Sequence, residues 1–189
     1  TEGRTLLALI LDAQAARRQP RYLDEILGRL PEKLNDLGYL GVIHPAGLIC
    51  EQQLAGHGWL LRALCELYAW KGEVQTLDLI RRIIHNLVIP TAGYHRQYPA
   101  DPDERKGGGS FAGTNQDQIG HWLVSTDTGC DFILLDGVVH AYRYLPLPAL
   151  QAVIEEMIER FLEIDLAAIQ AQTHASLTAI RGLLRYYAL

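Results

Sequence analysis

Three segments of the chain share one arrangement of polar and apolar positions. Each opens with a residue able to bind a ligand, continues through about three apolar helical turns and reaches a tyrosine; the opening residues are His57, Asp131 and His174. Helices that are apolar on most sides must be covered by other helices. We therefore expect three inner helices of a helical toroid, with the opening residues at its mouth, where a pocket normally forms.

Apolar residues at helical spacing also predict the partners of these inner helices. The expected helical stretches are residues 6–17, 22–37, 51–70, 73–88, 130–164 and 174–189, the fifth being a helical hairpin. Pro31 should either divide the second stretch or begin a new helix, and Gly72 should cap the third. The pattern predicts an all-α fold, an (α/α) toroid or barrel of helical hairpins. Residues 1–189 would form about half of it, as one domain.

Residues 90–128 are the long exception to this pattern. Residues 101–110 are charged and rich in proline and glycine, a composition that cannot bury enough apolar surface to become ordered. We expect a partly mobile loop, and our hypothesis for its role is a lid over the mouth. Gly107 to Gly109 do not predict a phosphate-binding loop, because no Gly-Lys-Ser/Thr ending follows them.

The composition narrows the classes of ligand. The chain has 189 residues, a net charge of −5 and no basic stripe, which argues against a nucleic-acid partner. No uncharged apolar run approaches the roughly 18 residues that span a bilayer, so no membrane partner is expected. The cysteines, Cys50, Cys65 and Cys130, are odd in number and widely spaced, which predicts reduced thiols. We expect no cofactor and no metal.

The most polar and aromatic part of the chain is residues 115–131. Its carboxylates, amides, hydroxyls and indole are the groups that a sugar site needs, and within it His121 and Trp122 are candidate substrate-binding residues. Asp127 and Asp131 are the candidate catalytic residues. Because a helix N-terminus lowers a carboxyl pKa, they are better suited to act as bases or sugar ligands than as acids. The alternative is that residues 125–128 merely cap the following helix.

Two further polar pairs lie near inner-helix starts. Gln53 and His57 are one turn apart on one helix face, and Gln172 and His174 are the matching pair near the C-terminus. Histidines at these places could bind sugar hydroxyls, transfer protons or serve only in packing, and two alone do not define a metal site. Asp136, inside an apolar helix, is expected to make a structural hydrogen bond.

The chain resembles the six-hairpin glycosidases, and most of all the catalytic domain of the β-L-arabinofuranosidase type. The resemblance is carried by residues 37–41 (Leu-Gly-Tyr-Leu-Gly), 53–72, 171–177 and 182–186. It implies an (α/α) barrel with a cleft at one end of the inner helices. The family's catalytic glutamate and zinc-binding cysteines belong to a later part of that domain, and no matching cluster exists here. The resemblance therefore implies the N-terminal part of such a barrel, completed by a second half or by a homo-oligomer.

These observations predict a glycoside hydrolase acting on a plant or microbial glycan, with two carboxylates and a carbohydrate as the bound partner. The alternatives are a noncatalytic helical-repeat module that binds protein, and a toroid sugar epimerase or polysaccharide lyase. The glycosidase hypothesis requires Asp127, Asp131, His57 and His174 to converge on one concavity. An incomplete toroid should also expose the apolar flank of its terminal helix.

Overall fold

The computed structural model describes residues 2–18, 20–105, 115–125 and 127–189, and is mostly helical, as expected. Its α-helices are α1 (Glu2–Ala16), α2 (Leu23–Lys33), α3 (Glu51–Lys71), α4 (Val74–Ile83), α5 (Leu134–Tyr142), α6 (Pro148–Glu163) and α7 (Thr173–Tyr187). None of the described helices is long and apolar enough to cross a membrane.

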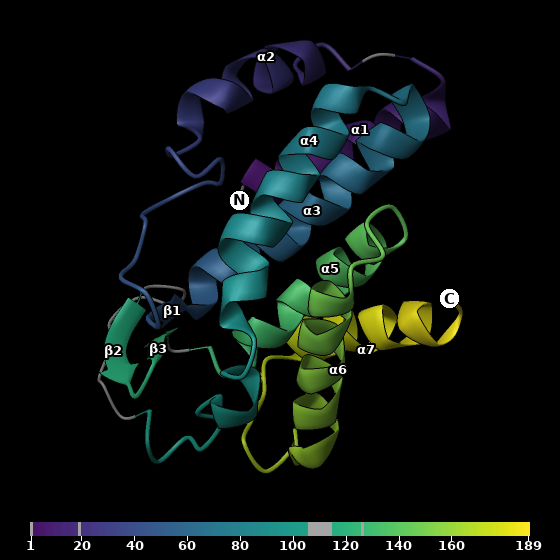
Figure 1. Cartoon of the computed structure of the whole chain (residues 1–189). Coiled ribbons are helices and arrows are strands. Elements are labelled where there is room, and N and C mark those ends of the chain that lie inside the picture. The colour runs from purple at the N-terminus through teal and green to yellow at the C-terminus, as the bar shows by residue number, and fades with distance from the viewer. Residues whose placement is uncertain (1, 19, 106–114, 126) are drawn as a thin grey trace.

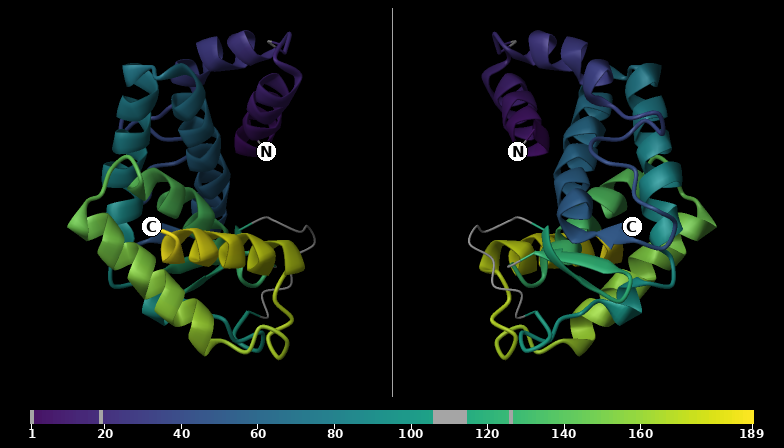
Figure 2. Two further views of the ribbon diagram at one scale, coloured as in Figure 1. Left: turned by 90° about the vertical axis from the view of Figure 1, so that its right-hand side faces the viewer. Right: turned by 90° about the vertical axis from the view of Figure 1, so that its left-hand side faces the viewer.

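Alternate helices form a continuous row. Helix α1 packs against α3, α3 against α5 and α5 against α7, while α4 and α6 pack on α3 and α5 respectively. Figure 1 shows α3 and α4 side by side, with α5, α6 and α7 below them, and Figure 2 shows the same row from both sides. Helices α3 and α5 therefore each contact two other helices of the row and one of the covering helices.

Glycines set the close spacing within this row. A Cβ atom added at Gly58 of α3 would lie 2.6 Å from the carbonyl oxygen of Ile133, and one added at Gly182 of α7 would lie 2.8 Å from the amide nitrogen of Asp136. Gly137 of α5 meets the backbone of Gly58 directly. Glycine inside a helix costs about 1 kcal/mol relative to alanine. Here it permits backbone-to-backbone contact that no side chain would allow.

The helical hairpins have nearly the expected boundaries. Helix α3 ends at Gly72, which adopts the left-handed conformation at φ 68°. Helix α4 continues as a π-helical turn, Ile84–Val88, so the expected helix over residues 73–88 is formed in two geometries. Pro31 neither divides α2 nor restarts it: it lies near the end of α2, which stops at Lys33.

The expectation that residues 90–128 lack regular structure is wrong for part of that segment. Strands β2 (Asn115–Ile119) and β3 (Trp122–Ser125) form an antiparallel hairpin, and β3 also pairs in parallel with β1 (Ile49–Cys50). The sheet therefore joins the segment to the start of α3. The glycine run at 107–109, the centre of the hypothesised lid, lies outside the described residues.

Helix α7 exposes an apolar flank, as the sequence pattern predicts. Leu177, Ile180 and Leu184 of α7 keep 62%, 41% and 60% of their surface exposed. They follow one another at three- and four-residue spacing, so they form one stripe along the helix.

Candidate functional site

A cavity of about 360 Å³ opens where the N-terminal ends of α1, α3 and α7 meet residues 127–133. We call it the mouth cavity. It is lined by Arg4, Gln52, Ala55, Gly56, Trp59, Asp127, Cys130, Ile133, Gln172 and His174. Three residues expected at a sugar site, Asp127, Gln172 and His174, are thus brought together.

The chain joins these three residues through the start of α7. The amide of Gln172 donates to the carbonyl oxygen of Thr128 at 3.1 Å, which sets the residue before α7 beside Asp127. Ser125 Oγ accepts from the amide of Asp127 at 3.2 Å and from the Gln52 side chain at 2.8 Å. The alternative was that residues 125–128 merely cap the following helix. Neither α5 nor the 3-10 turn before it has a side-chain cap, so this alternative is wrong for residues 125, 127 and 128.

Arg4 and His174 meet across the mouth cavity. A terminal nitrogen of Arg4 lies 3.1 Å from His174 Nε2, and the guanidinium carbon lies over the Trp59 ring, 5.1 Å from its centroid. Since arginine only donates, His174 Nε2 must accept, which leaves the ring proton on Nδ1. Burial, and then the charge of Arg4, lower the pKa of His174, while Asp127 opposes this. His174 is therefore a neutral imidazole near pH 7.

Gln53 and His57 line a neighbouring cavity of about 500 Å³, which shares Gln52 and Gly56 with the mouth cavity. Both ring nitrogens of His57 are occupied: Nδ1 donates to the carbonyl oxygen of Gln53 at 2.7 Å, and Nε2 accepts from the amide of Leu40 at 3.0 Å. Burial lowers the pKa of His57 to about 4. His57 thus holds the segment before α3, and neither of its ring nitrogens is left for the ligand contact expected of it.

Gln53 has a similar role. Its side-chain amide donates to the carbonyl oxygens of Leu40 and Val42, at 3.0 and 2.9 Å. Gln53 lines the neighbouring cavity, but both N–H donors of its side chain are bonded to these two carbonyl oxygens. Gln53 thus fixes the Leu-Gly-Tyr-Leu-Gly segment against α3.

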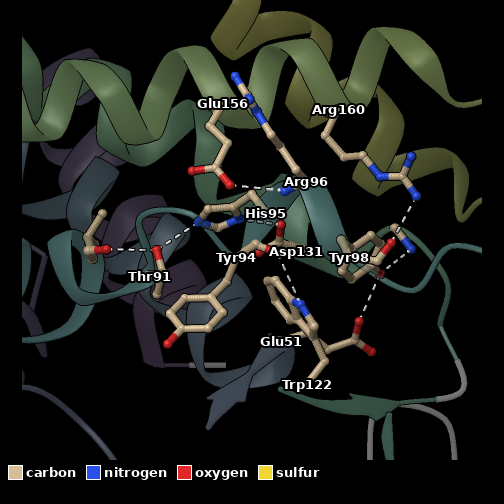
Figure 3. Close-up of polar contacts among 12 residues, drawn as sticks. Glu51, Thr91, Tyr94, His95, Arg96, Tyr98, Trp122, Asp131, Glu156 and Arg160 are labelled. Atoms are coloured by element: carbon tan, nitrogen blue, oxygen red, sulfur yellow. Dashed lines mark hydrogen bonds and ion pairs between the residues drawn. The ribbon is translucent and has the colours of Figure 1, made fainter. Parts of the chain in front are cut away.

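Asp131 does not face any of these cavities. It is 0% exposed, and its Oδ2 lies 2.8 Å from Nδ1 of His95, whose Nε2 lies 2.7 Å from the Thr91 hydroxyl (Figure 3). Asp131 belongs to a 3-10 turn, Cys130–Ile133, and α5 begins only at Leu134. That extra turn directs the carboxylate into the core. The expected catalytic role of Asp131 in the mouth cavity is therefore wrong.

Thr91, His95 and Asp131 have the spacing of a nucleophile, base and acid, but not their function. The Thr91 hydroxyl lies 2.7 Å from the carbonyl oxygen of Val88 and 2.7 Å from His95 Nε2, so its one proton has two neighbouring acceptors to choose between. All three side chains are buried. The arrangement is a structural link between the end of α4 and the start of α5.

His121 and Trp122 also lie away from the mouth cavity. Trp122 is 1% exposed, packs edge-on against Tyr98 and donates its Nε1 hydrogen to the carbonyl oxygen of Tyr94 at 3.3 Å. His121 is exposed, contacts the carbonyl oxygen of Gly47 at 2.8 Å and lines a separate cavity beside Arg160. The alternation of strand β3 explains the burial of Trp122, and the expected sugar-binding roles of both residues are wrong for the mouth cavity.

A second buried cluster adjoins Asp131. Glu51, at the start of α3, is 0% exposed and accepts from Tyr98 at 2.8 Å and from Arg105 at 2.6 Å. The Tyr98 hydroxyl in turn accepts from the Gly129 amide at 2.8 Å. Burial, and then the charge of Glu51, raise the pKa of Tyr98 well above its usual value. Together these side chains form what we call the packed polar core: Glu51, Thr91, His95, Tyr98, Arg105 and Asp131.

The inner surface of the helix row carries an arginine cluster. Asp136 of α5 accepts two bonds from Arg181, at 3.0 and 2.7 Å, and lies 3.3 Å from Arg185 and 3.6 Å from Arg62. The expected structural partner of Asp136 is thus confirmed. The cluster ties α3, α5 and α7 together where their glycines meet.

The cysteines offer no nucleophile in the mouth cavity. Burial raises the pKa of the Cys130 thiol to about 12, and burial likewise raises the pKa of Cys65 in the core of α3. The three thiols are buried. Among the described residues, no group of three or more His, Cys, Asp and Glu side chains could hold a metal ion.

Sequence reasoning missed Arg4, Gln52 and Trp59 as cavity residues. Trp59 lies inside an apolar helix and resembles core, while Arg4 is distant in sequence from the other lining residues. One signal was present: Gly56 and Gly58 flank Trp59. A Cβ at Gly56 would meet nothing within 4 Å, so this glycine leaves space at the cavity.

The four residues that the glycosidase hypothesis requires to converge do not share one concavity, so the four-residue catalytic site predicted from the sequence is not formed. Asp127 and His174 share the mouth cavity, His57 lies in the wall of its neighbour with both nitrogens occupied, and Asp131 is in the packed polar core. No protein-family model, curated protein or solved structure matches this chain significantly. The mouth cavity itself is therefore the basis for a proposal about function.

Proposed function

We propose that this chain binds sugar in the mouth cavity, as one wall of a carbohydrate-active (α/α) toroid. The observation that carries the proposal is the mouth cavity, where an indole, two amides, an imidazole and a carboxylate meet at one end of the inner helices. Amides and carboxylates hydrogen-bond sugar hydroxyls, while an aromatic ring packs on the apolar face of the sugar. The residues in these roles are Trp59, Gln52, Gln172, His174 and Asp127.

The arrangement of the helices supports the same proposal. Helices α1, α3, α5 and α7 succeed one another as inner elements, and α4 and α6 cover α3 and α5. Repeating that step would close a ring. The exposed stripe of α7, Leu177, Ile180 and Leu184, is the surface on which further toroid helices would pack.

In the proposed chemistry, Asp127 is one of two carboxylates acting at the glycosidic bond. Asp131 cannot be the second, because it is buried against His95. Among the described residues lining the two joined cavities, the other carboxylate is Glu2, which borders the neighbouring cavity. The proposal for the mouth cavity is therefore sugar binding, with hydrolysis requiring a second carboxylate from outside it.

The other enzyme classes have less support. An epimerase needs two histidines facing one sugar carbon, but His57 has no free ring nitrogen and lies in a different cavity from His174. A lyase needs a tyrosine beside the histidine, and no tyrosine is among the described residues lining the mouth cavity.

A second candidate function is protein binding through α7. The exposed stripe of Leu177, Ile180 and Leu184 favours it, because a protein surface rarely leaves such a row uncovered. Sedimentation velocity tests it: self-association that Leu184→Glu abolishes would favour a homo-oligomer, and a monomer at every concentration would argue against one.

Sugar binding can be measured by calorimetry and saturation-transfer NMR with a panel of neutral and acidic oligosaccharides. Trp59→Ala should weaken binding at least about fivefold through loss of stacking, and Trp59→Phe should retain most of it. Trp70→Ala is the matched control, since Trp70 lies at the other end of α3 and is 38% exposed. Equal binding by Trp59→Ala and the natural chain, or no binding of any sugar, would refute the proposal.

A further inference from the structure

We propose that the sugar bound in the mouth cavity is a uronic acid residue, whose carboxylate pairs with Arg4. The inference rests on the proposed sugar-binding function and adds the chemical class of the ligand. Three observations support it: Arg4 has no carboxylate partner, an arginine cluster lies behind Trp59, and neutral side chains line the rest of the cavity.

Arg4 is a cation in the cavity lining without a carboxylate partner. Its guanidinium contacts the neutral Nε2 of His174 at 3.1 Å and the face of Trp59 at 5.1 Å. None of the carboxylates in the described part of the chain forms an ion pair with it, Asp127 in the same cavity included. In contrast, Arg181 on the same indole, at 5.9 Å, is held by two bonds to Asp136. In the lining of the mouth cavity, Arg4 thus has guanidinium N–H groups that are available to a ligand.

The surface behind Trp59 adds positive charge. Arg62, Arg181 and Arg185 surround the single carboxylate of Asp136, so three positive charges meet one negative charge within 3.6 Å. Burial is the main cause that lowers the pKa of Arg62, and Arg181 and Arg185 add to it, while Asp136 and Glu66 oppose it. The field from this cluster favours an anion at the cavity, against the opposing charge of Asp127.

The remaining lining groups suit a sugar ring that carries the anion. A guanidinium binds a carboxylate with two parallel hydrogen bonds, which a neutral hydroxymethyl group cannot accept. Trp59 would pack against the ring, and the side chains of Gln52 and Gln172 would bond its hydroxyls. Because His174 accepts from one end of Arg4, it holds the guanidinium over the indole and acts as a positioning residue.

The test compares charged and uncharged forms of the same sugar. The probes are trimers of galacturonic, glucuronic and mannuronic acid and their fully methyl-esterified forms, titrated by calorimetry into the natural chain. At least one acid trimer should bind about tenfold or more tightly than its ester, and added salt should reduce the difference. Arg4→Gln should reduce it to about twofold or less, and Arg4→Lys should retain part of it.

The matched control is Arg18→Gln, which removes the same charge from an exposed position just beyond the other end of α1. It should leave the acid preference unchanged. A preference that persists in Arg4→Gln, or equal loss in Arg18→Gln, would overturn the role of Arg4. If acid and ester bind equally and only Trp59→Ala weakens both, the inference fails but sugar binding stands. If neutral sugars bind and no acid trimer does, the inference also fails, whereas no binding of any sugar refutes the proposed function.

Discussion

The mouth cavity and the packed polar core contain the same kinds of residue but use them differently. Each has an aspartate and a histidine, and each has a tryptophan beside it. In the core, His95 and Asp131 are both 0% exposed and bond each other. In the mouth cavity, Asp127 and His174 are half-buried and line open space.

The difference lies in hydrogen-bond partners rather than in composition. The carboxylate of Glu51 in the core is used by Tyr98 and Arg105, which leaves no free acceptor pointing at solvent. Arg4 in the cavity has only a neutral acceptor and a ring face. The core is buried and bonded mostly within itself, although Asp131 Oδ1 and Arg105 Nε have no hydrogen-bond partner there. A buried cluster of this kind stabilises the fold, whereas a donor that faces open space can bind a ligand. Substitutions can test this distinction.

The largest effect should come from the ion pair of the core. Glu51→Gln leaves the Arg105 guanidinium, 3% exposed in its side chain, without a counter-charge, and should lower the free energy of unfolding by about 3 kcal/mol or more. Urea denaturation measures this. The control Glu32→Gln removes the same charge from an exposed site on α2 and should change stability by less than about 0.5 kcal/mol. Equal stabilities for the two variants would contradict the comparison.

The next largest effect is a loss of stability in acid, caused by protonation of His57. Both ring nitrogens of this histidine are hydrogen-bonded to the backbone in the folded protein. Its pKa is about 4 in the folded protein and near 6.5 when unfolded, so the unfolded state takes up the proton first as pH falls. Its contribution is complete above pH 6.5 and is lost progressively towards pH 4, by about 3 kcal/mol. Denaturation at a series of pH values should show a smaller slope in His57→Gln. An unchanged slope would mean that other groups cause the acid sensitivity.

The smallest effect separates the two aspartates. Asp131→Asn removes the charge that His95 faces in the core and should cost about 2 kcal/mol, while Asp127→Asn in the cavity should cost less than about 0.5 kcal/mol. Thermal unfolding of the two variants measures the difference. Asp127→Asn should instead reduce sugar binding, and a stable Asp131→Asn would show that the buried link contributes little.

Much of the helical fold could be predicted, because helix positions depend on local patterns. The apolar spacing in α3 and its glycine cap at Gly72 identify the helix and its end without reference to the rest of the chain. The sheet could not be predicted in the same way. Strand β1 has two residues and becomes a strand only by pairing with β3, more than 70 residues later. Residues 115–125 were therefore expected to be loop.

The candidate site was predictable only where side-chain direction follows from local structure. His174 is in the first turn of α7 and faces the mouth cavity, as a helix-opening residue should. In the sequence, Asp131 appears equivalent to His174, because it too precedes an apolar helix. It lies in a 3-10 turn before α5, however, and its carboxylate points into the core and contacts His95. A change of helix type by one turn is a small local energy difference, and packing decides it.

The sequence by itself determined most of the helical segments, since these depend on the periodicity of apolar residues along the chain. Only the tertiary structure decided which polar residues remain without partners. Asp127, Gln172 and His174 share a cavity with Arg4 because three helix ends meet residues 127–133 there. Such meetings depend on contacts between residues far apart in the chain, and no local pattern records them.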